Sequence, residues 1–405
     1  MPNAEAPPPR PQTDADLARV SPEVTSLDLS GAAISNDGLS TLRRLPQLES
    51  VRLAWTPVTD DGVAALAACP RLRHVDLLGT STGDGAIRAL AGKPDLCDFR
   101  SGNLVTDEGL ARLHDLPAFK EWRGGRRAMA LLSSDAKPNY LLLRGSFTDR
   151  GLAGLSGLQG LFALNLDSDR LSVTGAGLAP LEALPHLEWL GFDAADASMA
   201  HIAALPHLRF LLCQDTRATD DGFVALSKCS TLEYLWGRRC HNLRRRGFKA
   251  LSALPALRAL SVSCLNVDDE GLAVLPDFPA LTELMPMDVP DDGYRHVGLC
   301  TRLESLVLMY CRETTDAATA HLTGLGALKK YFASYNQITD RTPEILSSLS
   351  SLEDVTFDSC GGLTNAGVAT LARLPRLRHV AVSGMPGVTA AIIDAFPKGV
   401  VRYTS

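Results

Sequence analysis

The sequence predicts an α/β solenoid, with short parallel strands on a concave face and helices on the convex face. Two observations predict this fold class. Segments of the form L-x-x-L-x-L recur along the 405 residues at a mean spacing of about 23.5 residues, which gives roughly 16 units. Most of these segments precede apolar residues on the 3.6-residue period of a helix. One such unit cannot bury its apolar side alone, so successive units must stack on one another.

Residues 48–72 show how one complete unit is organised. Leu48, Val51 and Leu53 predict the strand, and the run Thr-Asp-Asp-Gly at 59–62 predicts the start of the helix. A threonine hydroxyl at this point can accept free backbone N–H groups, and acidic residues oppose the positive end of the helix. We expect the glycine to leave room where neighbouring units crowd together, and we interpret the whole motif as scaffold.

The same helix start recurs in VTDDGVAAL (58–66), VTDEGLARL (105–113), FTDRGLAGL (147–155), ATDDGFVAL (218–226) and VDDEGLAVL (267–275). These segments resemble the leucine-rich repeat proteins, in the bacterial form of their cysteine-containing class. The resemblance covers about residues 13–403. It implies a right-handed, horseshoe-shaped solenoid, and it implies that the protein serves as a recognition surface.

The repeat also predicts how the chain is divided. Residues 1–12 are rich in proline and should be disordered, and residues 13–23 should form a helix that caps the first unit. The solenoid spans 24–400, followed by a tail at 401–405. Within it, the unit at 119–136 is too short for the regular pattern and lacks the helix-start motif, so we expect a kink or a lid there. The last strand has an open edge that could pair with another chain.

Composition and cysteine placement limit the function. The net charge of −6 argues against binding to nucleic acid, and no apolar run reaches the roughly 18 residues that cross a membrane. The nine cysteines recur at fixed places in the repeat, such as Cys69, Cys229 and Cys300, which predicts buried packing groups rather than disulfides. With no secretion signal, we expect a cytoplasmic protein. No nucleotide-binding, metal-ligand or nucleophile motif is found, so no cofactor, metal ligand or catalytic residue is predicted.

Candidate binding residues follow from the position in each unit. If the first Leu of a strand is position 1, positions 3, 5, 7 and 8 should face the concavity, with about 4.8 Å between neighbouring units. The first zone carries alternating charges at position 5, namely Asp28, Arg52, Asp76, Arg100 and Arg123, with Trp55, His74 and Asp98 beside them. It could be a self-paired ladder, a patch for a charged peptide, or a catalytic group of His74, Asp76 and Asp98.

The second zone is acidic and comprises Asp167, Asp193 and Asp215. Carboxylates this close need compensation. It could come from Arg238 and Arg239, from a basic group of a partner, or from a metal ion.

The third zone places large apolar side chains where a plain solenoid would expose polar ones. Its members are Trp189, Phe210, Tyr234, Trp236, Met285, Met287, Met309, Tyr310, Phe332 and Tyr335. Such a patch usually marks an interaction site. The alternatives are an error in the assigned register, or aromatic rings that simply cover one another.

We therefore expect a module that binds a protein or peptide on its concave face, through the apolar zone flanked by arginine and aspartate residues. The alternative is an enzyme, or an accessory subunit of a peptide-modifying enzyme, that uses the concave floor as a cleft. In that case Asp167, Asp193, Asp215, Arg238 and His74 are the residues to test.

Overall fold

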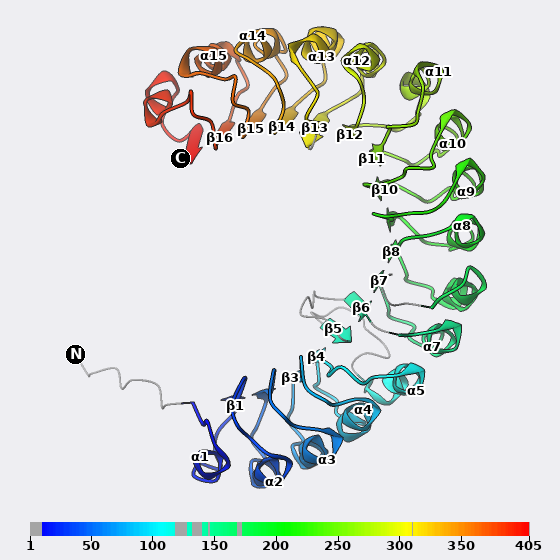
Figure 1. The fold of residues 1–405 in the computed structure, drawn as a ribbon, viewed down its shortest axis with the longest axis vertical. Helices are drawn as coiled ribbons and strands as arrows, with labels where there is room; N and C mark the ends of the chain where they lie inside the picture. The colour runs from blue at the N-terminus through cyan, green and yellow to red at the C-terminus, as the bar shows by residue number, and fades with distance from the viewer. Residues whose placement is uncertain are drawn as a thin grey trace. The chain divides into compact units, whose positions relative to one another are not determined.

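The computed structural model describes residues 10–117, 128–131, 140–144, 146–167, 172–309 and 311–404. The chain divides into two compact units. Unit 1 comprises residues 1–192 and 205–208, and unit 2 comprises residues 193–204 and 209–405. Strands and helices alternate along the chain within each unit (Figure 1).

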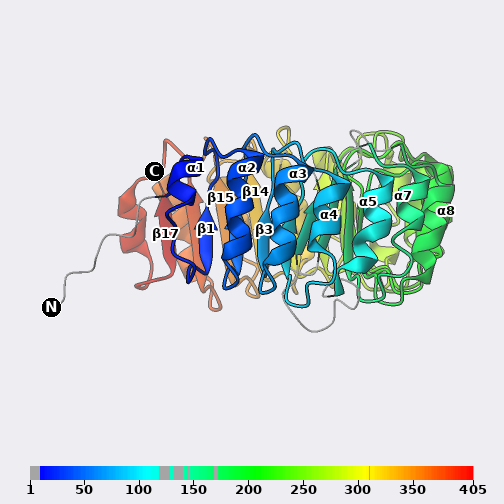
Figure 2. The ribbon, with the colours of Figure 1, turned by 90° about the horizontal axis from the view of Figure 1, so that it is seen from below.

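Unit 1 contains one sheet of parallel strands that pair in chain order. The strands are β1 (Ser26–Asp28), β2 (Ser50–Arg52), β3 (His74–Asp76), β4 (Asp98–Arg100), β5 (Ala128–Leu131), β6 (Tyr140–Arg144), β7 (Ala163–Asp167) and β8 (Trp189–Phe192). The helices are α1 (Asp14–Leu17), α2 (Asn36–Leu39), α3 (Asp60–Val63), α4 (Asp84–Leu90), α5 (Asp107–Ala111) and α7 (Asp149–Ala153), with 3₁₀ turns η1 (Ser40–Arg44), η2 (Ala64–Ala68), η3 (Arg112–Asp115) and η4 (Ala176–Ala183). Helices α1 to α5 lie side by side (Figure 2).

Unit 2 repeats this arrangement, again with parallel strands paired in chain order. Its strands are β9 (Phe210–Leu212), β10 (Tyr234–Gly237), β11 (Ala259–Ser263), β12 (Glu283–Met287), β13 (Ser305–Met309), β14 (Lys330–Ser334), β15 (Asp354–Asp358), β16 (His379–Ser383) and β17 (Val401–Thr404). Its helices are α8 (Asp196–Ala203), α9 (Asp220–Leu226), α10 (Arg245–Leu251), α11 (Asp269–Leu272), α12 (Tyr294–Val297), α13 (Asp316–Ala320), α14 (Arg341–Leu346) and α15 (Asn365–Ala369). The 3₁₀ segments are η5 (Leu275–Asp277), η6 (Asp291–Gly293), η7 (His321–Gly324), η8 (Thr370–Arg373) and η9 (Ala390–Ala395).

The predicted fold class is confirmed. In β15, Val355 and Phe357 point into the core while Asp354, Thr356 and Asp358 alternate with them on the other face. Residues at equal positions of neighbouring units are paired, as in Trp236, Ser261 and Met285 on β10, β11 and β12. The strand face of each unit can therefore be read as columns of equivalent positions.

Two predicted segments are wrong. The unit that was expected to start a strand at Phe119 instead has β5 at Ala128–Leu131, with Ala130 opposite Arg100. Ala130 therefore occupies position 5 of that strand, and Arg123 lies outside the described residues, as do all of 118–127 and 132–139. Residues 401–404 are not a tail, because β17 pairs with β16. Residues 1–9 also lie outside the described part of the chain.

In many units, an acidic residue near the start of the helix connects successive repeats. Asp84 Oδ1 accepts the Thr106 backbone N–H at 2.9 Å, and its Oδ2 accepts the Thr106 hydroxyl at 2.7 Å. The same pair of contacts, which we call the inter-repeat cap, recurs from Asp14 to Ser35, Asp107 to Thr148, Asp149 to Thr174, Asp196 to Thr219, Asp291 to Thr315, Asp316 to Thr339 and Asp340 to Thr364. Asn36 and Asn365 take this role toward Thr59 and Thr389.

The inter-repeat cap explains the glycine of the motif. A Cβ atom on Gly109 would lie 2.2 Å from Asp84 Oδ1. The glycine therefore makes room for the carboxylate of the preceding repeat, and the scaffold interpretation of the motif agrees with these contacts.

The nine cysteines are free thiols, and all except Cys97 are buried. Those in the predicted turn slot bond back to the chain, since Cys240 Sγ lies 3.3 Å from Gly237 O, as Thr56 Oγ1 lies 2.6 Å from Leu53 O. Burial raises the pKa of Cys300 to about 12 and that of Cys311 to about 11. These thiols are packing groups, as predicted.

Candidate functional site

The strand face of unit 2 carries a patch of large apolar side chains. We call it the apolar patch, and it comprises Phe210, Tyr234, Trp236, Met285, Met309, Phe332 and Tyr335. Trp236 and Tyr335 are the most exposed, at 42% and 53%, and the others are half-buried. The predicted positions 3, 5 and 8, and position 7 at Met309, therefore do face outward at these residues.

Three members of the predicted apolar zone are not counted in the apolar patch. Met287 is only 4% exposed, so its predicted place on the surface is wrong. Ser263 and Ser334 are also buried at the same position 7, whereas Met309 at position 7 of β13 is only half-buried, so exposure at this position differs from unit to unit. Trp189 belongs to unit 1, where it packs against Leu142 and Ala163. Tyr310 lies outside the described residues.

A hollow of about 320 Å³ lies within the apolar patch. Its centre is β11, which contributes only the small side chains of Ala259 and Ser261 to this face. Tyr234 and Trp236 flank them on β10, and Glu283 and Met285 flank them on β12. We call this feature the β11 hollow, and Phe210, Ser305, Val307 and Met309 complete its lining.

The aromatic wall of the β11 hollow is held by a charged group. The Phe210 and Tyr234 rings stack with their centroids 5.6 Å apart, and the Arg258 guanidinium lies 4.7 Å from the Tyr234 centroid. Glu233 binds Arg209 at 2.7 Å and Arg258 at 3.2 Å. The hydrogen bond from Arg209, with the charge of both arginines, lowers the pKa of Glu233. While the Glu233 carboxylate is ionised, it pairs with Arg258, which in turn contacts the Tyr234 ring of the aromatic wall.

Two polar features of the β11 hollow have no side-chain partner among the residues that the structure describes. Among the described residues, nothing forms a hydrogen bond with the Ser261 hydroxyl, and its oxygen is buried. Glu283 is exposed, and its carboxylate makes no ion pair with the described part of the chain. An unsatisfied buried hydroxyl destabilises a site by about 1–3 kcal/mol.

The acidic zone is compensated in part from within. In unit 2, Asp215 pairs with Arg239 at 2.8 Å, and Asp193 Oδ1 accepts the Asp215 backbone N–H at 2.9 Å. Arg238 is exposed on β10's end, beyond Trp236. The side chain of Asp167 lies outside what the structure describes. Of the predicted explanations, internal compensation is observed for Asp215, through Arg239.

Unit 1 carries a second, polar hollow of about 330 Å³ over β2 to β4. It is lined by Ser50, Arg52, His74, Asp76, Asp98 and Arg100, together with backbone-facing Val51 and Val75. Arg100 pairs with Asp76 at 3.4 Å, and His74 Nδ1 lies 3.8 Å from Asp98 Oδ2. The predicted charge ladder is therefore only partly paired.

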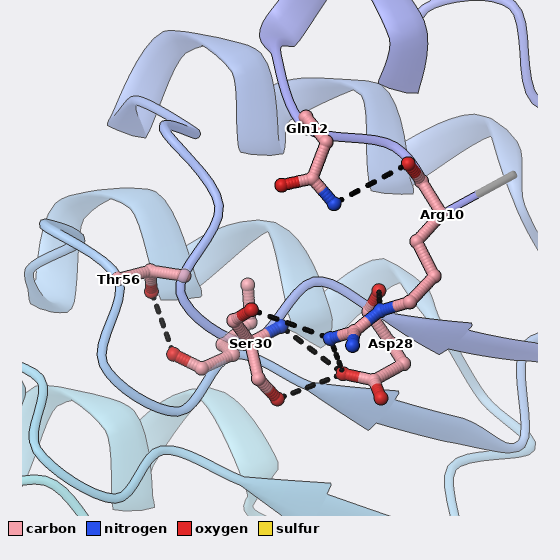
Figure 3. A network of polar contacts seen from close by, with 6 residues as sticks. Arg10, Gln12, Asp28, Ser30 and Thr56 are labelled. Carbon is pink, nitrogen blue, oxygen red and sulfur yellow. Dashed lines mark hydrogen bonds and ion pairs between the residues drawn. The ribbon is translucent and has the colours of Figure 1, made fainter.

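Asp28, the first charged residue of this ladder, forms an ion pair with a residue that the repeat pattern did not indicate. Arg10 binds Asp28 at 2.6 Å, and the Ser30 hydroxyl binds the same carboxylate oxygen at 2.8 Å (Figure 3). Burial alone would raise the pKa of Asp28, but the hydrogen bonds from Ser30, helped by Arg10, lower it. Arg52 consequently has no ion pair among the residues described.

Four residues other than glycine have a left-handed backbone at position 8, namely Trp55, Asp288, Tyr335 and Ser359. Trp55 and Tyr335 have φ angles of 60° and 56°, in the left-handed region. Gly31, Gly79 and Gly384 occupy the same position in other units with similar φ angles. A left-handed residue other than glycine costs of order 1–3 kcal/mol. Trp55 is 68% exposed, with its ring against Gly79.

Within the described residues, the chain has neither a cluster of metal ligands nor a helix that could span a membrane. No group of three or more His, Cys, Asp or Glu side chains could hold a metal ion there. In that same part of the chain, no helix has the length and apolar character needed to cross a membrane.

Comparison with known proteins agrees with the repeat. A family model for the leucine-rich repeat matches residues 20–42 and 45–67. No curated protein sequence matches the chain. Two units therefore match the leucine-rich repeat model, and the repeated parallel strands and helices have the architecture of a leucine-rich repeat solenoid.

Solved structures with a similar architecture share little sequence. An internalin from Listeria monocytogenes is 16% identical, with 97% of this chain and 88% of that chain covered and a TM-score of 0.41. A leucine-rich repeat protein of Leptospira interrogans is 15% identical, covering 94% and 90%, with a TM-score of 0.45. A chain of the mouse RP105/MD-1 complex is 15% identical, covering 93% and 77%, also with a TM-score of 0.45.

The sequence did not predict the residues that give the β11 hollow its shape without being large outward-pointing side chains. Ala259 and Ser261 are small and were not candidates, and Glu233 and Arg258 lie just outside the counted positions. One signal was present, namely two small residues at positions 3 and 5 between units with large ones.

Proposed function

We propose that this protein is a recognition module that binds a protein or peptide partner on the strand face of unit 2. The apolar patch is the observation that carries the proposal, because it exposes Trp236 and Tyr335 on a rigid sheet. Exposed apolar patches commonly mark interaction sites, and Trp and Tyr are frequent binding hot spots. Leucine-rich repeat solenoids in general serve as protein-binding modules.

The strained backbone at Tyr335 supports the same proposal. Glycine would adopt this conformation without strain, as Gly31 and Gly384 do at the equivalent position. Because Asp288 and Ser359 adopt the same conformation at this position, it is the exposed aromatic side chain of Tyr335, and not the strain alone, that is consistent with a role in binding.

The proposal includes flanking polar contacts. Asp193, Asp215 and Arg238 would contact the partner from unit 2, and Arg52, Trp55 and Arg100 would provide a separate polar contact on unit 1. Trp189, Asp167, Tyr310 and Arg123 remain proposed contacts, whereas Met287 is withdrawn because it is buried.

We also propose a cytoplasmic location and a bacterial, cysteine-containing class of repeat. Nine free thiols, eight of them buried, suit a reducing compartment.

Affinity capture tests the proposed function. Tagged wild-type protein and Trp236→Ala/Tyr335→Ala are incubated with native lysate, and bound proteins are quantified by mass spectrometry. The control is Leu265→Ala/Leu299→Ala, because these exposed residues, at 59% and 61%, lie in unit 2 outside the apolar patch. We expect the patch variant to lose at least tenfold of a specific partner that the control retains. Equal capture by all three forms would rule out the apolar patch as the site.

A further inference from the structure

We propose that the β11 hollow binds one bulky apolar side chain of the partner, and that a basic residue next to this side chain pairs with Glu283. This inference rests on the proposed function and specifies the chemistry that the site selects. Its basis is the shape of the hollow, the character of its lining and the charge at its edge.

The shape favours a single anchoring side chain. The hollow of about 320 Å³ is at the lower end of the 300–1,000 Å³ range of small-ligand pockets. Its depth comes from the small side chains of Ala259 and Ser261 between Trp236 and Met285. Since five neighbouring strands, β9 to β13, line it, the hollow exists before a partner arrives.

The lining favours an apolar occupant. Phe210, Tyr234 and Trp236 form one side, and Met285, Val307 and Met309 form the other. Methionine side chains adapt to the shape of an occupant, whereas the aromatic wall is fixed by stacking and by Arg258. A rigid wall facing an adaptable one accepts a large aromatic or branched aliphatic group.

The charge favours a basic neighbour. The Glu283 carboxylate lines the β11 hollow and lies between Ala259 and Ser305 in the register, neither of which can neutralise it. Glu233, the nearest acidic residue on the opposite side, is already bound by two arginines. Glu283 forms no ion pair with any described residue, so it is the carboxylate of this hollow that would bind a lysine or arginine of the partner.

Ser261 supplies a polar contact at the bottom of the site. Its hydroxyl has no hydrogen-bond partner among the described residues. Rotation about the Cα–Cβ bond would turn it toward the hollow, where a backbone amide of the bound segment can satisfy it.

Methionine-methyl NMR with short peptides tests this inference directly. Protein labelled at the methionine methyl groups is titrated with acetylated dipeptide amides, namely Phe-Lys, Phe-Glu and Ala-Lys. We expect Phe-Lys to shift the Met285 and Met309 signals and to bind at least threefold more tightly than Phe-Glu and Ala-Lys. Equal binding of all three peptides, or no shift at these two methionines, would overturn the inference.

Three variants separate a binding effect from a folding effect. Ser261→Leu should fill the hollow and abolish the shifts, whereas Thr356→Leu adds similar bulk at the same position of β15, outside the hollow, and should not. Glu283→Lys should reverse the preference toward Phe-Glu. If Glu283→Lys leaves the preference unchanged, the basic-neighbour assignment is wrong.

This test can fail independently of the proposed function. Loss of the captured partner in Trp236→Ala/Tyr335→Ala, without any dipeptide binding, would leave the recognition surface in place and overturn only the anchoring role of the hollow.

Discussion

At the scale of single residues, large side chains were easier to predict than the spaces between them. The period of the repeat correctly assigned Phe210, Tyr234 and Trp236 to the outer face, because strand alternation alone decides which way they point. It failed at Met287, which is buried although Met309 at the same position 7 is half-buried, because the repeat period alone does not set the exposure of this position. It could not reveal the β11 hollow, which depends on which small and large residues become neighbours across adjacent strands.

The glycine of the helix-start motif provides a prediction at this scale. We expect Gly109→Ala to lower the free energy of unfolding by about 1–3 kcal/mol, because the new methyl group would overlap Asp84 Oδ1. Urea unfolding followed by circular dichroism measures the change.

The matched control is Gly361→Ala. A Cβ atom there has no neighbour within 4 Å, so the change should stay within about 0.5 kcal/mol. Equal effects at both positions would show that the close approach to Asp84 is not what requires glycine.

At the scale of strands and helices, the spacing of the repeat was a reliable guide only where it was regular. Residues 119–136 were aligned by counting, which put a strand at Phe119, but the chain uses the apolar run Ala128–Leu131 for β5. The hydrogen bonds between repeats could not be predicted either, because the sequence of one unit does not show which residue of the next unit each side chain contacts. The acidic residues were predicted to oppose the helix end, whereas their carboxylates bind the next repeat as inter-repeat caps.

The inter-repeat cap can be tested by substitutions that the chain itself suggests. Asp84→Ala removes both bonds to Thr106, and we expect a loss of roughly 0.5–2 kcal/mol in the free energy of unfolding. Asp84→Asn should lose less, because Asn36 and Asn365 already make this contact in their repeats. Urea midpoints of the two variants decide the matter, and an asparagine variant as unstable as the alanine variant would show that the negative charge is required.

At the scale of the whole molecule, the repeat determines the fold but does not identify the binding partner. Each repeat contacts mainly its neighbours, so stability is distributed along the array and individual outward residues are free to vary. For this reason the sequence predicted an α/β solenoid and an outward apolar zone, but no pattern in it identifies what binds. The site must be argued from local features, namely Trp236, Tyr335 and the β11 hollow.

Site-specific photo-cross-linking in living cells tests the central claim most directly. A photoreactive benzoylphenylalanine replaces Phe332 on β14 in one form of the protein and Ala320 on α13 in another. The two sites are close in the sequence, but one lies on the strand face and the other on an exposed helix. We predict that the form with the probe at 332 cross-links to a discrete partner and that the form with the probe at 320 does not. Cross-linking from 320 alone would contradict recognition by the strand face.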